Sequence, residues 1–182
     1  MSGIDNGSGD GRVAAWFDLD GTLITVNSGA LWMKRERRLE RITRWQYIQG
    51  AFYLLAYKIS LLDMDRVMTK ALQTVKGLEE DTVRRWTHEW FEKEVEMFLA
   101  PGAESALRWH RERGHLLLLC TSSSPYESEI ACRKFGLDGF VSSRYEVEDG
   151  RFTGRLIAPA CYGRGKVYWS ERYASAHGID LE

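Results

Sequence analysis

The periodicity of hydrophobic and polar residues changes along this chain. A short apolar run at 13–17 is typical of a buried strand. From Ser28 to about Leu99, apolar residues recur at steps of three and four, which predicts a block of helices. Ser28 and Asp63 have side chains suited to helix N-caps. The apolar positions of the first helices, which we expect to form the core of this block, are Leu31, Trp32, Leu39, Ile42, Trp45, Tyr47, Ile48, Phe52, Tyr53 and Tyr57.

After Pro101-Gly102, short strands alternate with helices. The unbroken apolar run at 115–120 predicts a strand that is buried on both faces. The other predicted elements are helices at 103–113, 127–135 and 165–177, a short strand starting at 140, and a hairpin that turns at Asp149-Gly150. This alternation predicts an α/β fold with a parallel sheet and helices on its faces.

The helical block interrupts this α/β pattern and is therefore predicted to be an insertion after the first strand. The N-terminal residues are rich in Gly, Ser, Asp and Asn and have no apolar stretch, which favours a mobile tail over a signal peptide. The predicted division is a disordered tail at 1–11, a sheet core at 12–26 and 100–182, and a helical insertion at 27–99.

Composition excludes some classes of function. The chain has 182 residues and a net charge of -1, which gives no reason to expect binding to nucleic acid. Its most apolar long segment, 45–62, contains Gln46, Gln49, Gly50, Lys58 and Ser60, so we expect no transmembrane helix. The three cysteines show no CxxC spacing and fit a reducing compartment, which favours the cytoplasm.

Candidate chemistry begins directly after the first strand, with Asp18 and Asp20 in the sequence Asp18-Leu19-Asp20-Gly21-Thr22. Because side chains alternate along a strand, both carboxyls start on the same side. Two like charges this close are tolerated if a cation lies between them or if one carboxyl holds a proton. The simpler alternative is a turn, since Asp-Gly is a common turn pair.

Two further polar signals fall at or near strand ends. Thr121 to Ser124 follow the second strand, and Lys166 begins the last helix. Reactive groups of parallel sheets lie at the carboxyl ends of strands, and a carboxylate pair, hydroxyls and an ammonium suit phosphoryl transfer. The hydroxyl residues could instead cap a helix, and Lys166 could be a solvated lysine.

These motifs, in this order, resemble the haloacid dehalogenase-like (HAD) hydrolase superfamily. Within it, the chain looks like the phosphoserine-phosphatase-like group, subfamily IB, also through 130–137, 148–154 and 161–166. The resemblance covers 13–182 and implies a three-layer Rossmann-like core with an inserted all-helical (C1-type) cap. It implies a Mg²⁺-dependent phosphatase that acts on a small phosphomonoester through an aspartyl-phosphate.

The resemblance also assigns roles to residues. Asp18 would be the nucleophile and Asp20 the general acid and base, and Lys166 would orient the nucleophile and the phosphate. Thr121 would bind phosphate, with Ser122 and Ser123 as alternative hydroxyls. The Asp18 carboxylate and the backbone carbonyl of Asp20 would bind Mg²⁺.

The chain departs from this group at two points. It ends before the strand whose acidic motif completes the metal site, so we expect a truncated product, with a natural short form as the alternative. A phosphate-binding pseudo-phosphatase is then the second hypothesis for function. At Asn27 the group's phosphatases have a glutamate that binds the substrate's amino group, so phosphoserine specificity is not carried over.

Two expectations concern partners. The basic residues before Trp45 form a solvated face or, alternatively, attract an anionic substrate, such as a lipid phosphate, or phospholipid headgroups: Lys34, Arg35, Arg37, Arg38, Arg41 and Arg44. In that alternative, the aromatic residues Trp45, Tyr47, Phe52, Tyr53 and Tyr57 would form an apolar partner surface. Without a final strand, the sheet edge would invite pairing with a second copy, which is why a homo-oligomer is considered.

Overall fold

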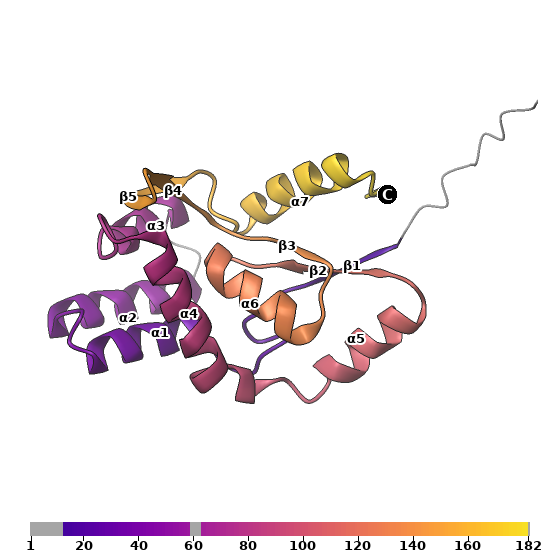
Figure 1. The fold of residues 1–182 in the computed structure, drawn as a ribbon, viewed down its shortest axis with the longest axis horizontal. Coiled ribbons are helices and arrows are strands. Elements are labelled where there is room, and N and C mark those ends of the chain that lie inside the picture. The colour runs from indigo at the N-terminus through magenta and orange to yellow at the C-terminus, as the bar shows by residue number, and fades with distance from the viewer. Residues whose placement is uncertain (1–12, 59–62, 182) are drawn as a thin grey trace, which may run out of the picture.

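The computed structural model describes residues 13–58 and 63–181, and the side chains of 53–58 are not described. The tail predicted at 1–11 lies outside the described residues. Strands β1 (Ala14–Phe17), β2 (Leu116–Cys120) and β3 (Gly139–Val141) form a parallel sheet in the order β1-β2-β3 (Figure 1). The parallel sheet predicted from the apolar runs is confirmed.

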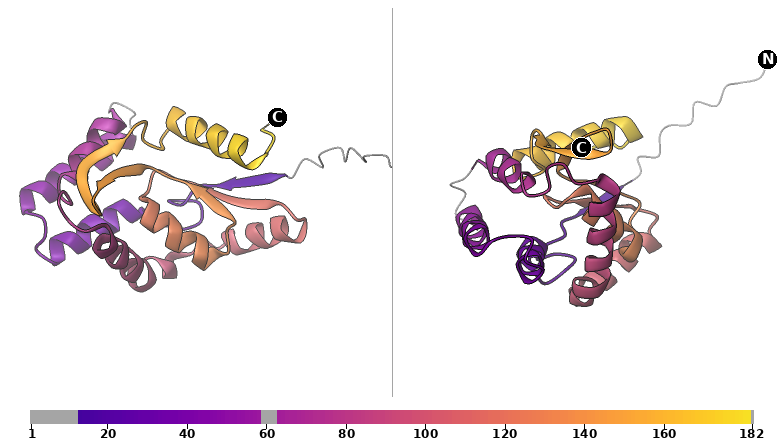
Figure 2. Two further views of the ribbon diagram at one scale, coloured as in Figure 1. Left: turned by 45° about the horizontal axis from the view of Figure 1, so that its top comes forward. Right: turned by 60° about the vertical axis from the view of Figure 1, so that its left-hand side comes forward.

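Helices cover both faces of this sheet. Helices α5 (Ala103–Glu112) and α6 (Pro125–Phe135) lie on one face, and α7 (Arg164–His177) lies on the other (Figure 2). Gly136 ends α6 in the left-handed conformation, at φ 65°, where a side chain would be strained. The result is the three-layer α/β fold that the sequence predicts.

The helical insertion separates β1 from β2 and lies beyond one end of the sheet (Figure 1). Its elements are α1 (Ser28–Arg38), α2 (Arg44–Lys58), α3 (Met64–Leu72), α4 (Glu80–Glu94) and the 3₁₀ helix η1 (Glu96–Phe98). The chain segments that enter and leave the insertion are hydrogen bonded to each other. Thr25 N–H donates to Phe98 O and Ala100 N–H donates to Leu23 O, each at 2.9 Å.

The predicted hairpin is present as β4 (Arg144–Glu148) and β5 (Arg151–Ile157). Its turn has positive φ at Asp149 (49°) and Gly150 (73°), as a tight two-residue hairpin turn requires. The hairpin is bonded to the insertion: Gly77 N–H donates to Phe152 O at 2.8 Å, and Glu80 N–H donates to Gly150 O at 2.9 Å. The insertion is therefore attached to the rest of the chain at two places.

Two expectations for the insertion are wrong. The N-cap of α1 is Asn27, whose side chain accepts a hydrogen bond from Ala30 N, and Ser28 is the first helical residue. Asn27 takes this role because it has the extended backbone of an N-cap and its amide oxygen reaches the helix's free N–H groups. Asp63 caps α3 as predicted, through bonds from Asp65 N and Arg66 N.

The second correction concerns the aromatic residues of α2. Trp45 and Phe52 are 66% and 64% exposed, and Leu39 and Ile48 are also exposed, so these residues do not form the core of the insertion. Helix α2 packs mainly against α1 and α3, and these apolar side chains stay exposed. The side chains of Tyr53 and Tyr57 lie outside the description.

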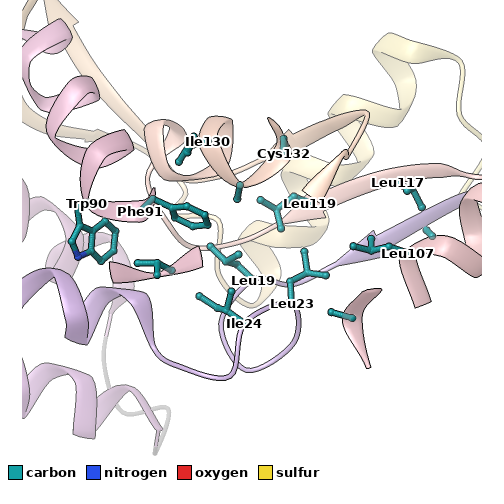
Figure 3. Close-up of a cluster of buried hydrophobic side chains, with 14 residues drawn as sticks. Leu19, Leu23, Ile24, Trp90, Phe91, Leu107, Leu117, Leu119, Ile130 and Cys132 are labelled. Carbon is teal, nitrogen blue, oxygen red and sulfur yellow. The ribbon is translucent and has the colours of Figure 1, made fainter. Parts of the chain in front are cut away.

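The main core joins the sheet to the insertion (Figure 3). Leu19, Leu23 and Leu119 of the sheet region pack with Phe91 of α4, and all four are 0% exposed. None of the helices in the described parts of the chain is long and apolar enough to cross a membrane. The core thus fixes the segment containing the two aspartates between β2 and α4.

Replacing Leu119 with alanine tests this core. Leu119→Ala should destabilise the protein by about 2–5 kcal/mol, because the cavity cannot close between a strand and two helices. Urea unfolding followed by circular dichroism measures the change. Leu39→Ala, at a 44% exposed position, is the control and should change stability by no more than about 0.5 kcal/mol. Equal losses in the two variants would contradict the assignment of the core.

Candidate active site

The first strand ends in an ion pair. Asp18 follows β1, and its Oδ1 accepts a hydrogen bond from Leu19 N at 2.8 Å. Its Oδ2 lies 2.8 Å from Nζ of Lys166, in the first turn of α7. The side chains of Asp18 and Lys166 are 43% and 27% exposed, so the pair can be reached from solvent. The structure thus joins two residues that are far apart in the sequence.

The position of Lys166 depends on close packing at the start of α7. A Cβ atom at Gly165 would lie 1.8 Å from the carbonyl oxygen of Ala160. Gly163, the N-cap of the helix, has φ 51°, a conformation that favours glycine. These two glycines let the helix begin directly against the preceding loop, which places the lysine over Asp18.

Asp20 is held by the first turn of α1. Its Oδ1 accepts a hydrogen bond from Ser28 N at 3.0 Å, and its Oδ2 accepts one from Asn27 Nδ2 at 3.2 Å. Burial raises the pKa of Asp20 above its ordinary value, and the charge of Asp18 raises it further, while Ser28 and Lys166 oppose the shift. Asp20 is therefore suited to hold a proton beside the Asp18 carboxylate.

The hydroxyl residues follow β2, next to the end of β1 in the sheet. Since Phe17 pairs with Leu119, Asp18 and Thr121 both come just after paired strand ends. Thr121 is buried, and its Oγ1 accepts a hydrogen bond from Ser123 N at 3.2 Å. Ser122 and Ser123 are partly exposed. Ser124 is the N-cap of α6, so the capping alternative holds for this residue.

Glu127, in the first turn of α6, is a further carboxyl near the site that no sequence motif singles out. It is 7% exposed. Burial raises the pKa of its carboxyl to about 8, and the charge of Asp20 also contributes. The signal that was present, Ser124 followed three residues later by a glutamate, is typical of a helix capping box, so it points to a structural role. Only the fold shows that this carboxyl lies near Asp20.

The three cysteines, Cys120, Cys132 and Cys161, are buried and free. Cys120 and Cys161 share a small apolar cluster beside the ion pair. The neighbouring Cys161 thiol lowers the pKa of the Cys120 thiol below its ordinary value, although burial opposes this shift. These thiols belong to the wall of the site, next to Thr121 and the loop before α7.

Asp18 and Asp20 are the candidate metal ligands. Among the described residues there is no group of three or more His, Cys, Asp and Glu side chains that could hold a metal. The pair nevertheless fits a hard cation, because Mg²⁺ in proteins is often bound by one or two carboxylates with water and substrate phosphate.

The sequence-predicted residues therefore meet at one end of the sheet. Asp18 and Lys166 are in direct contact, and the charges of both shift the pKa of Asp20. Thr121, Ser122 and Ser123 follow the neighbouring strand. A carboxylate held by an ammonium group, beside a carboxyl that can keep its proton, can perform nucleophilic attack with acid–base assistance.

Comparisons with known proteins identify the family and the fold. Residues 15–182 match the family described as haloacid dehalogenase-like hydrolase. A phosphoserine phosphatase of Mycobacterium tuberculosis is 27% identical over 179 residues, which is 95% of this chain and 58% of that protein. The chain spans about 60% of the length of the first curated relatives that it matches.

Solved structures show the same fold. A protein of unknown function from Bordetella pertussis superposes with a TM-score of 0.82 at 23% identity, over 94% of this chain and 78% of that one. A phosphoserine phosphatase solved as a phospho-aspartyl intermediate analogue gives a TM-score of 0.63 at 20% identity, over 94% and 75% of the two chains. At these identities the similarity establishes the fold.

Substituting Gly165 tests how the ion pair is positioned. Gly165→Ala should lower the melting temperature, because its Cβ would meet a backbone oxygen and force the start of α7 to move. Thermal unfolding measures the loss, which we expect to be about 1–3 kcal/mol or more. The adjacent control, Val167→Ala at a 57% exposed position, should leave the melting temperature nearly unchanged. A fully stable Gly165→Ala protein would show that the packing is loose.

The raised pKa of Glu127 predicts a pH dependence of stability. The folded protein keeps this proton up to about pH 8, whereas the unfolded chain releases it near 4.5, so stability falls as pH rises across this interval. Glu127→Gln removes the titration. Its melting temperature should therefore rise relative to that of the parent protein between about pH 5 and pH 8. A difference that does not change with pH would contradict the shifted pKa.

Proposed function

This chain belongs to the haloacid dehalogenase-like hydrolase family, and we propose that it hydrolyses a small phosphomonoester through an aspartyl-phosphate on Asp18. The observation that carries this proposal is the contact of 2.8 Å between the Asp18 carboxylate and Lys166, with the Asp20 carboxyl beside it. The named activity of the phosphoserine phosphatase relative supports the same reaction class.

In the first step, the Asp18 carboxylate attacks phosphorus. A bond forms between the carboxylate oxygen and phosphorus, and the bond from phosphorus to the leaving oxygen breaks. Asp20 donates its proton to that leaving oxygen, a role supported by its raised pKa. In the second step, the ionised Asp20 takes a proton from water, which attacks phosphorus, releases phosphate and restores Asp18.

The transferring phosphate would be held by donors from two elements. The backbone N–H groups at the start of α6 favour an anion, and Ser122 and Ser123 lie there with partly exposed side chains. Because Oγ1 of Thr121 accepts a hydrogen bond from Ser123 N, its own hydrogen can be donated to a phosphate oxygen. Lys166 adds a positive charge from the opposite face of the sheet.

The Asp18 carboxylate and the backbone carbonyl of Asp20 would also hold Mg²⁺, which would supply positive charge to the phosphoryl group. We further propose that residues 27–99 act as a cap that excludes water and selects the leaving group. Where phosphoserine phosphatases have a glutamate that binds the substrate's amino group, this chain has Asn27, which donates a hydrogen bond to Asp20. We therefore do not propose phosphoserine as the substrate. The three free cysteines support a cytoplasmic location.

Asp18→Asn tests the proposed nucleophile. In the full-length protein this substitution should lower kcat by roughly 10³-fold or more, because an amide cannot form the acyl-phosphate. Phosphate release from a panel of small phosphomonoesters, with and without Mg²⁺, measures the effect. Asp149→Asn, in the exposed hairpin turn, is the matched control.

Unchanged turnover in Asp18→Asn would refute the nucleophile assignment. If the parent protein binds inorganic phosphate but releases none from any ester, the alternative of a non-hydrolysing phosphate-binding protein takes its place.

A further inference from the structure

Ser143 lies between β3 and β4, and its hydroxyl is hydrogen bonded to two separate loops. The residue is 0% exposed. Its Oγ donates a hydrogen bond to Ser122 O at 3.0 Å and accepts one from Cys161 N at 3.1 Å. Ser122 follows β2, whereas Cys161 lies in the loop that leads into α7. Because β3 packs against both α6 and α7, this hydroxyl lies where the two loops meet (Figure 2).

The loop that leads into α7 is held at two consecutive backbone N–H groups. Cys161 N donates to the hydroxyl of Ser143. Ala160 N donates to Oδ1 of Asp65, in α3, at 2.7 Å. The loop continues into the first turn of α7, which carries Lys166. The position of the loop therefore sets where the ammonium group of Lys166 lies.

The loop after β2 is held by the same segment of chain. Thr121 N donates to Val141 O at 3.1 Å, a backbone bond that does not depend on the side chain at 141. The carbonyl of Ser122 accepts its bond from the side chain of Ser143. The end of β3 thus holds both residues that follow β2, and one of these two bonds requires a hydroxyl.

A purely local role does not account for the bonds of Ser143. Serine side chains commonly bond to backbone groups of neighbouring residues, as Ser142 does through its Oγ, which donates to Ser143 O at 3.3 Å. Ser143 instead bonds to residues that are 21 and 18 positions away in the chain. Its hydroxyl also lies 3.4 Å from Sδ of Met68, a weaker acceptor than a carbonyl oxygen. Removing the hydroxyl would leave groups in two loops without their partners, which is costly for buried groups.

We propose that Ser143 is a positioning residue: it fixes the loop after β2 relative to the start of α7, and thereby the spacing between Ser122 and Lys166 around a bound phosphate. Without this bridge, the two loops can move independently. A displacement of about 1 Å caused by a change far from the chemistry can lower a rate by roughly 100-fold. The effect on turnover rests on the proposed function, whereas the bridge between the loops does not.

The first arm of the test measures the binding of inorganic phosphate to the full-length protein in the presence of Mg²⁺, by titration followed with phosphorus NMR. Ser143→Ala should raise the dissociation constant about 10-fold, because the two sides of the site no longer keep their spacing. The matched control is Ser142→Ala, which removes a neighbouring hydroxyl at a 4% exposed position and should stay within about twofold of the parent protein.

A double-variant cycle separates positioning from a general loss of structure. In a Lys166→Met background, Ser143→Ala should change the dissociation constant for phosphate by less than about twofold, because the spacing to the ammonium group no longer matters. An additional 10-fold loss in that background would overturn the inference and leave Ser143 as a structural residue. Turnover of p-nitrophenyl phosphate should follow the same pattern, with kcat lowered about 10-fold or more in Ser143→Ala alone.

The second arm follows amide hydrogen exchange in peptides that cover 121–124 and 160–166. Ser143→Ala should speed exchange in both peptides by about fivefold or more, because both loops lose one bond to the same hydroxyl. Asp65→Ala removes only the bond to Ala160 N, so it should affect 160–166 and leave 121–124 unchanged. Faster exchange in only one of the two peptides of Ser143→Ala, or in neither, would contradict the bridge.

The two arms also separate this inference from the proposed function. If the parent protein binds phosphate but hydrolyses no ester, the proposed function fails, and the binding cycle still decides whether Ser143 sets the spacing of the site. If the parent protein binds no phosphate, the positioning of a phosphate site is refuted, and the exchange arm decides only whether the loops are bridged.

Discussion

The ion pair between Asp18 and Lys166 is the interaction on which the rest of the site depends. It joins the end of the first strand to the last helix, with Nζ and Oδ2 at 2.8 Å. For this contact to form, α7 must begin tightly against the Ala160 carbonyl, which only glycine at position 165 permits. The charges of Asp18 and Lys166 also act in opposite directions on the pKa of Asp20. The two aspartates therefore have different environments although they are only two residues apart.

The insertion is part of the site as well as a neighbour of it. The same turn that starts α1 supplies both hydrogen bonds to Asp20, and its entering and leaving segments are bonded to each other. The hairpin β4–β5 holds the insertion from the other side, through Gly77 and Glu80. A movement of the helices would therefore change the orientation of the Asp20 carboxyl directly.

The differences between prediction and structure have local causes. Ser28 and Asn27 are both good N-cap residues, and sequence alone does not decide which of two adjacent residues has the extended backbone. Trp45 and Phe52 follow a helical period that usually indicates a buried face, but burial depends on whether another element covers that face. In the same way, Ser124 and Glu127 form a capping pattern in sequence, while the fold buries the carboxyl of Glu127 and so raises its pKa.

The sequence by itself determined the order of strands and helices, the parallel sheet and the candidates Asp18, Asp20, Thr121 and Lys166. Apolar periodicity, turn residues and motif spacing are local properties, and they suffice for these conclusions. Only the tertiary structure decided that Lys166 reaches Asp18, that Asn27 and Ser28 bind Asp20, and that Glu127 is buried beside them. Such contacts join residues distant in the chain, and their energies come from burial and charge, which no local pattern records.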